Sequence, residues 1–133
     1  MKYFTIEELT YSATAIKEGI DNTPDASVKS NLKRLIENLL DPIRADWGKP
    51  ITVTSGYRCK ALNDAVGGVV NSEHMSGNAA DITAGDRQKN LLLFNQIKSN
   101  KKLHFRQLID ESSLKWIHIS YNPADNKMQI LAL

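Results

Sequence analysis

The stretch GKPITVTSG, residues 48–56, marks the place where the pattern of this sequence changes. Its central residues, 51–54, are all β-branched and lie between Pro50 and Gly56, so they predict a short β-strand. Before this strand the apolar residues follow helical spacing, and after it most segments have the pattern of strands. Helices followed by strands predict an α+β fold, in which an antiparallel sheet is flanked by helices.

The part before this strand, about residues 1–48, predicts two helices. The segment TIEE, residues 5–8, has the form of a capping box and opens a helix that extends to about Lys17, after which Gly19 ends it. The segment TPD, residues 23–25, opens a second helix, and its proline suits the first helical position.

The second helix has a continuous apolar stripe. Pro42 lies inside this stripe and predicts a kink or a break near residues 39–41, and Gly48 closes the helix. The residues that follow the 3.6-residue spacing of a core-facing helix are Val28, Leu32, Leu35, Ile36, Leu39, Leu40, Ile43 and Trp47.

The part from about residue 49 to residue 133 predicts the sheet. We expect the last three strands to be consecutive along the chain and antiparallel. Beyond the strand at 51–54, strands are expected over residues 79–83, 105–111, 114–121 and 128–133, and helices over residues 59–65 and about 86–99.

The composition is typical of one soluble domain spanning residues 1–133. Hydrophobic residues make up 41% and charged residues 24% of the chain, and the net charge of +2 is too small to predict nucleic-acid binding. The single cysteine, Cys59, excludes an intrachain disulfide. Acidic residues interrupt residues 1–12, and no apolar run approaches the ~20 residues of a membrane span, so we expect a monomer without signal peptide or membrane span.

The segment NSEHMSGNAADIT, residues 71–83, carries two candidate metal ligands. Zinc binds histidine nitrogen and carboxylate oxygen, and a catalytic zinc site keeps one position open for water. The spacing suits a loop that carries His74 and a strand that carries Asp81, with small residues that let the loop fold back. Taken alone, it is also compatible with an exposed loop histidine and a turn aspartate.

The segment WIHIS, residues 116–120, supplies a candidate third ligand. Strand alternation puts Trp116, His118 and Ser120 on one face. Two histidines and one aspartate would leave an open position on zinc. The structural alternative is a hydrogen-bonded strand histidine, and Trp116 is part of the core or of a pocket wall in either case.

A hydrolytic metal site also needs a general base, and Asp110 and Glu111 are the candidates. A two-residue or a four-residue loop after them places Glu111 on the face of His118, whereas a three-residue loop favours Asp110. The four-residue loop, residues 112–115, sets Glu111 opposite Trp116 and makes it a diagonal neighbour of His118, with Cα atoms ~7–8 Å apart. We therefore predict Glu111 as the base.

Arg58 ends the segment SGYR, directly after the predicted strand at 51–54. Arginine binds carboxylates through two parallel hydrogen bonds, so Arg58 could hold a carboxylate of a peptide substrate. A structural ion pair is the alternative.

Four motifs follow one another along the chain, and their order is more specific than any one of them. They are Ser55-Gly56-Tyr57-Arg58, Leu62-Asn63 with Val66-Gly67-Gly68, Ser72-x-His74-x-x-Gly77-x-Ala79-x-Asp81, and Trp116-x-His118. Together they resemble the zinc D-Ala-D-Ala carboxypeptidase family, in its small single-domain branch found in bacteriophages and prophages. Residues 11–15 and 19–24 are similar to the opening of that branch, so the resemblance covers nearly the whole chain.

The resemblance implies the hedgehog/DD-peptidase fold, with one zinc ion in a groove over the sheet. It implies that Glu111 occupies the family's acidic catalytic position. It also implies that Arg58 corresponds to the arginine that stabilises the substrate carbonyl or carboxylate. Ser72 and Trp116 are then expected to line the substrate pocket. The implied zinc ligands are His74, Asp81 and His118.

The resemblance implies a zinc metallopeptidase that hydrolyses peptidoglycan stem or cross-bridge peptides next to D-amino acids. Whether it acts as a D,D-carboxypeptidase or as an endopeptidase stays open. The phage branch implies an endolysin that acts at the cell wall, which it would reach after holin-type release or by another secretion route. The alternative is an inactive zinc-containing module for wall binding or morphogenesis, in which Glu111 would be dispensable.

Two acidic residues depart from the family pattern. Glu73 stands where relatives often carry glutamine, and Asp110 adds an acid beside Glu111. Neither departure removes a catalytic group, but both leave the substrate preference open.

Overall fold

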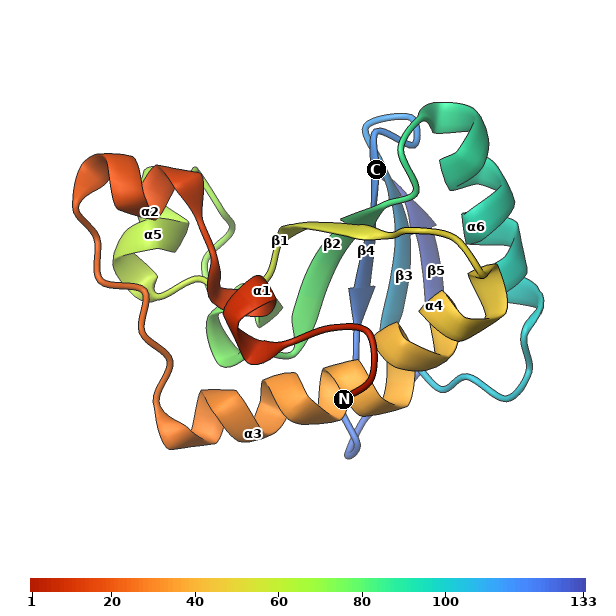
Figure 1. The fold of residues 1–133 in the computed structure, drawn as a ribbon, viewed down its shortest axis with the longest axis horizontal. Helices are drawn as coiled ribbons and strands as arrows, with labels where there is room; N and C mark the ends of the chain where they lie inside the picture. Colours follow the sequence, from red (N-terminus) through yellow and green to blue (C-terminus); the bar gives the residue numbers. More distant parts are fainter.

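The computed structural model describes residues 1–133 and contains a five-stranded sheet with helices packed against it (Figure 1). The order of the strands across the sheet is β1-β2-β4-β3-β5. The predicted α+β fold with a mostly antiparallel sheet is confirmed. The strands are β1 (Thr52–Ser55), β2 (Ala79–Thr83), β3 (Gln107–Glu111), β4 (Trp116–Ser120) and β5 (Gln129–Ala132).

The last strand corrects one prediction. β3 and β4 pair antiparallel as expected, but β5 runs parallel to β3 and lies at the edge of the sheet. β4 lies between β2 and β3, so the outer edge of β3 is free to pair with a further strand. Because β4 has returned the chain to the end of the sheet where β3 begins, a strand that then adds to β3 runs in the same direction as β3.

The first predicted helix is divided into two. Thr5 caps α1 (Ile6–Thr10), and its hydroxyl accepts a hydrogen bond from the N–H three residues later, as the capping box predicts. The chain then leaves helical geometry, and Ser12 caps a second helix, α2 (Ala13–Glu18), in the same way. One continuous helix over residues 5–17 is therefore wrong, because Ser12 starts a new helix.

The second predicted helix is long and changes its winding in the middle. Asp25 is its N-cap, so Pro24 precedes the cap instead of occupying the first helical position. A π-helical stretch comes directly before the turn that contains Pro42, where we expected a break. The wider turn accommodates a residue that has no N–H and whose ring crowds the preceding carbonyl. The segments are α3 (Ala26–Leu35), the π-helical η1 (Ile36–Leu40) and α4 (Asp41–Trp47).

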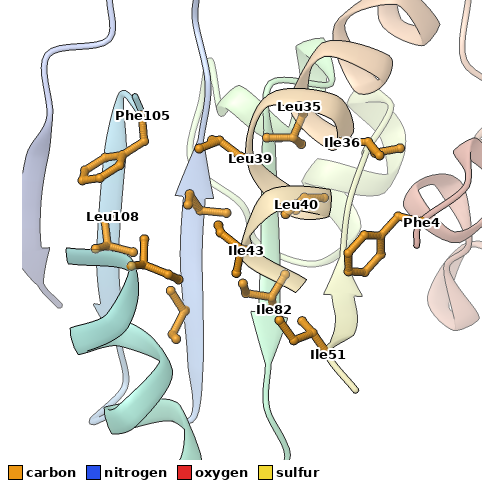
Figure 2. Close-up of a cluster of buried hydrophobic side chains, with 14 of the residues drawn as sticks. Phe4, Leu35, Ile36, Leu39, Leu40, Ile43, Ile51, Ile82, Phe105 and Leu108 are labelled. Atoms are coloured by element: carbon orange, nitrogen blue, oxygen red, sulfur yellow. The ribbon is translucent and has the colours of Figure 1, made fainter. Parts of the chain in front are cut away.

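The core lies between the sheet and a layer of helices. Figure 2 shows Ile43 of the long helix beside Ile82 of β2, and Leu39 and Leu108 belong to the same buried cluster. The helix α6 (Arg87–Ser99) packs into the same cluster through its apolar residues. One face of the sheet is thus buried, and the other face is left to carry polar side chains.

Two short helical elements come between β1 and β2 in the sequence. They are α5 (Lys60–Ala65) and the 3₁₀ turn η2 (Glu73–Ser76). In Figure 1, α5 lies next to α2 at the end of the molecule opposite α6. None of the helices combines the length and the apolar composition needed to cross a membrane.

Candidate metal centre

Three polar side chains meet on the face of the sheet that is turned away from the core. β2 places Ala80 and Ile82 in the core, so strand alternation puts Asp81 on the opposite face. His118 lies directly opposite Asp81 in the antiparallel pair of β2 and β4. His74 comes from η2, the turn that precedes β2.

The donor atoms of these side chains converge. The Oδ1 of Asp81 lies 3.0 Å from the Nδ1 of His118 and 3.3 Å from the Nε2 of His74, and the three donor atoms lie within 4.8 Å of one another. Zinc–ligand bonds of about 2.0–2.2 Å separate neighbouring donors of a tetrahedral site by about 3.3–3.6 Å. The three side chains therefore fit a zinc ion.

His74 is held in the orientation that a metal ligand needs. Its Nδ1 lies 2.7 Å from the carbonyl oxygen of Gly56, which can only accept a hydrogen bond, so Nδ1 carries the proton. The lone pair of His74 is then on Nε2, the atom that faces Asp81. A hydrogen bond of this kind from the second ring nitrogen is the usual support of a metal-bound histidine.

The turn that carries His74 depends on a glycine at its end. Gly77 has a left-handed φ of 79°, which is costly for other residues. A side chain there would also press against Val28 and Leu32 of α3. The loop between His74 and Asp81 can therefore close against the long helix only because Gly77 has no Cβ.

Asp81 is buried yet remains ionised. Burial by itself raises the pKa of this carboxyl, but its close contacts with the imidazoles of His118 and His74 outweigh burial and hold the pKa well below its ordinary value. The carboxylate also lies 3.4 Å from the Nη2 of Arg58 through its other oxygen, Oδ2. Asp81 is thus an anionic donor for a cation.

Arg58 lies next to Asp81, and three side-chain hydrogen-bond acceptors hold its guanidinium group in place. Besides Asp81, its Nε donates to Ser55 Oγ at 3.0 Å and its Nη1 to Asn63 Oδ1 at 3.2 Å. Burial lowers the pKa of the guanidinium, and the charge of Asp81 opposes this shift. These contacts leave two of the five guanidinium N–H groups free for another partner.

Asn63 is a residue whose importance the sequence indicated only through its place in a motif. It is 1% exposed, and besides accepting from Arg58 it donates through Nδ2 to the carbonyl of Val69 at 2.9 Å. A Cβ on Gly68 would overlap the Oδ1 of Asn63. Asn63 therefore joins Arg58 to the loop that contains Gly68 and Val69.

The structure has the four-residue loop between β3 and β4. Glu111 lies opposite Trp116 and Ile109 lies opposite His118, so Glu111 and His118 share one face as diagonal neighbours. Asp110 belongs to the other face, and its Oδ1 accepts a hydrogen bond from the backbone of the loop at 2.7 Å. The geometry thus favours Glu111 over Asp110 as the acid beside the three donors.

A cleft of about 360 Å³ contains all the site residues that the sequence predicted. One wall is the loop after α5, where the side chains of Val66 and Val69 are exposed. The predicted residues in its lining are Arg58, Ser72, His74, Asp81, Glu111, Trp116 and His118.

Glu73 points to a different partner. Its carboxylate lies 3.0 Å from the Nε of Arg106, which also pairs with Asp125. The charge of Glu73 is therefore balanced outside the cleft that holds the three donors.

An anionic and two imidazole donors beside an acid and an arginine, in a cleft over a sheet, are groups that metal-dependent hydrolases use. The chain matches the model of the family described as Peptidase M15 over residues 2–120, and it belongs to that family. The predicted family is therefore confirmed.

A curated relative shares a short segment with this chain. The zinc D-Ala-D-Ala carboxypeptidase of Streptomyces albus G is 54% identical over 39 residues. This segment is 29% of the present chain and 15% of that carboxypeptidase. The likeness is therefore high but local.

Proposed function

We propose that this protein is a zinc peptidase that hydrolyses peptide bonds of peptidoglycan, with His74, Asp81 and His118 as the zinc ligands. The observation that carries the proposal is the convergence of these three donors from η2, β2 and β4 in one cleft. The name of the Streptomyces relative, a zinc D-Ala-D-Ala carboxypeptidase, supports zinc and a D-Ala-D-Ala peptide. We further propose that residues 1–133 act as one catalytic domain and as a monomer.

Zinc, when bound, would lower the pKa of its water to about 7 and polarise the scissile carbonyl. Glu111, on the same face as His118, accepts the proton of the attacking water and passes it to the leaving amine. Arg58 donates its two free N–H groups toward the carbonyl oxygen, where negative charge develops. Ser72 and Trp116 line the cleft and contact the substrate.

The test combines metal content with hydrolysis of purified muropeptides. The variants are Glu111→Gln, His118→Ala and, as a matched control, Asp110→Asn, which makes the same acid-to-amide change on the opposite face of β3. We expect one zinc per chain in the wild type, Glu111→Gln and Asp110→Asn, with hydrolysis lost only in Glu111→Gln of these three. His118→Ala should lose zinc and activity.

Two outcomes would decide against the proposal. Full activity of Glu111→Gln would remove the proposed base. Bound zinc without hydrolysis of any muropeptide would favour the inactive wall-binding or morphogenesis module.

The setting that we propose is the cell wall, reached after holin-type release during phage or prophage lysis. The likeness of residues 11–15 and 19–24 to the phage branch supports it. Induction of the protein with and without a holin in a bacterial host tests it, because lysis should need the holin. Lysis at the same rate without the holin would contradict this setting.

A further inference from the structure

The charges around the cleft bear on which peptide bond can be cleaved. A peptidase that removes a C-terminal residue has to bind a carboxylate one residue beyond the scissile bond. Taking a carboxylate out of water is costly unless a cation or several donors receive it. Such an enzyme therefore needs a free cation close to its metal centre.

The cleft itself offers a single guanidinium. Arg58 is the only lysine or arginine in its lining, where Asp81 and Glu111 are the acids. The side chain of Arg58 is only 15% exposed, and three of its N–H groups already have acceptors. If its two remaining N–H groups serve the scissile carbonyl, no cation is left for a terminal carboxylate.

Two hollows adjoin the cleft. The first shares Arg58 and Val66 with it and extends toward residues 11–14, where α1 is followed by the start of α2. Arg58 is again the only cation in this lining, and apolar and hydroxyl side chains make up much of the rest. This side can accommodate a neutral stretch of peptide.

The second hollow shares Ser72 with the cleft. Its lining is rich in amide side chains, Asn71, Asn78 and Asn122. Its one cation, Arg106, is already paired with the carboxylates of Glu73 and Asp125, which together more than balance its charge. This side therefore also suits uncharged backbone and side-chain groups.

From these observations we infer that the protein is an endopeptidase, which cleaves an internal bond of a peptide that extends from the cleft into both hollows. This inference rests on the proposed function. Water oxygen bonds to the scissile carbonyl carbon, the C–N bond breaks, and the proton taken by Glu111 leaves with the new amine. The residues on either side of the bond bind through neutral contacts and not through a terminal carboxylate.

Matched peptides test the inference with the wild-type protein. The first is a stem pentapeptide with a free terminal carboxylate, the second is the same peptide with a C-terminal amide, and the third is a cross-linked muropeptide dimer. Mass spectrometry identifies the products. We expect cleavage only at internal bonds, no release of the terminal amino acid, and rates for the free acid and the amide that agree within a factor of about three, because an uncharged cap costs little where no buried cation has to be satisfied.

Release of the terminal amino acid from the free acid, with a loss of about 100-fold or more in the amide, would overturn the inference, because a site built for a carboxylate rejects an analogue that lacks it. The proposed function would survive that result. Absence of hydrolysis of all three substrates by the zinc-loaded protein would overturn both. Products from internal cleavage that also require Glu111 support both.

Discussion

Gly67 and Gly68 are adjacent at the edge of the cleft, yet a methyl group is expected to act differently at each. Gly67 has a left-handed φ of 71°, and a Cβ there would meet no atom within 4 Å. A Cβ on Gly68 would overlap the Oδ1 of Asn63 and would approach the Nη1 of Arg58 to 3.0 Å. Gly67→Ala thus changes only the backbone energy, whereas Gly68→Ala disturbs the support of Arg58.

The structure sets the size of both effects. An alanine in left-handed conformation costs about 1–2 kcal/mol, which Gly67→Ala should lose in stability alone. Asn63 can give way to a methyl on Gly68 only by releasing its hydrogen bonds to Arg58 and Val69. The bond to the guanidinium is charge-assisted and is worth about 1.5–3 kcal/mol. If Arg58 acts on the transition state, kcat/KM of Gly68→Ala should fall roughly 10- to 150-fold.

The assay is muropeptide hydrolysis at saturating zinc, with thermal unfolding measured for both variants. We expect Gly67→Ala to melt at a lower temperature but to keep its kcat/KM, and Gly68→Ala to lose kcat/KM while it keeps one zinc. Equal kcat/KM for the two variants would refute the reasoning that Asn63 positions Arg58.

Three further predictions concern the elements that hold the site. Gly56→Ala places a Cβ onto the backbone of Leu9, so the unfolding free energy should fall by about 3 kcal/mol or more and zinc affinity should fall with it, as thermal unfolding and zinc titration would show. Ser12→Ala removes the cap of α2 and should cost about 1 kcal/mol in denaturant unfolding without a change in zinc affinity. Removal of zinc by a chelator should lower the melting temperature of the wild type but not that of His74→Ala, because a metal that binds only the folded state stabilises it.

The sequence was sufficient to predict the local structure of the segments that form the site. The buried run at residues 79–83 predicts β2, and strand alternation predicts which residues of β4 share a face with His118. The choice between Glu111 and Asp110 depended on the length of one loop. Ser112 and Ser113 adopt left-handed φ angles of 50° and 56°. Serine does not favour this conformation, so the residue types in the loop did not predict it.

Long-range features were harder to predict, because they depend on how other strands and loops of the fold are arranged in space. The direction of β5 follows from which edge of the sheet remains free. The role of Asn63 follows from the fold of the loop above it, and a buried asparagine inside a short helix has no periodicity that reveals its partners. Ser12 did offer a signal, since serine is a favoured N-cap, but the apolar pattern around it continued without a break.

The helical part of the chain, residues 1–48, has a direct role in the metal centre although it contributes none of the three donors. Antiparallel pairing of β2 and β4 is enough to bring Asp81 and His118 together, but His74 lies on a turn outside the sheet. α3 holds that turn, because the Nδ2 of Asn31 donates to the carbonyl of Ser76 at 2.9 Å. The sheet therefore supplies two donors by its register, and the third lies on a turn that the long helix helps to hold in place.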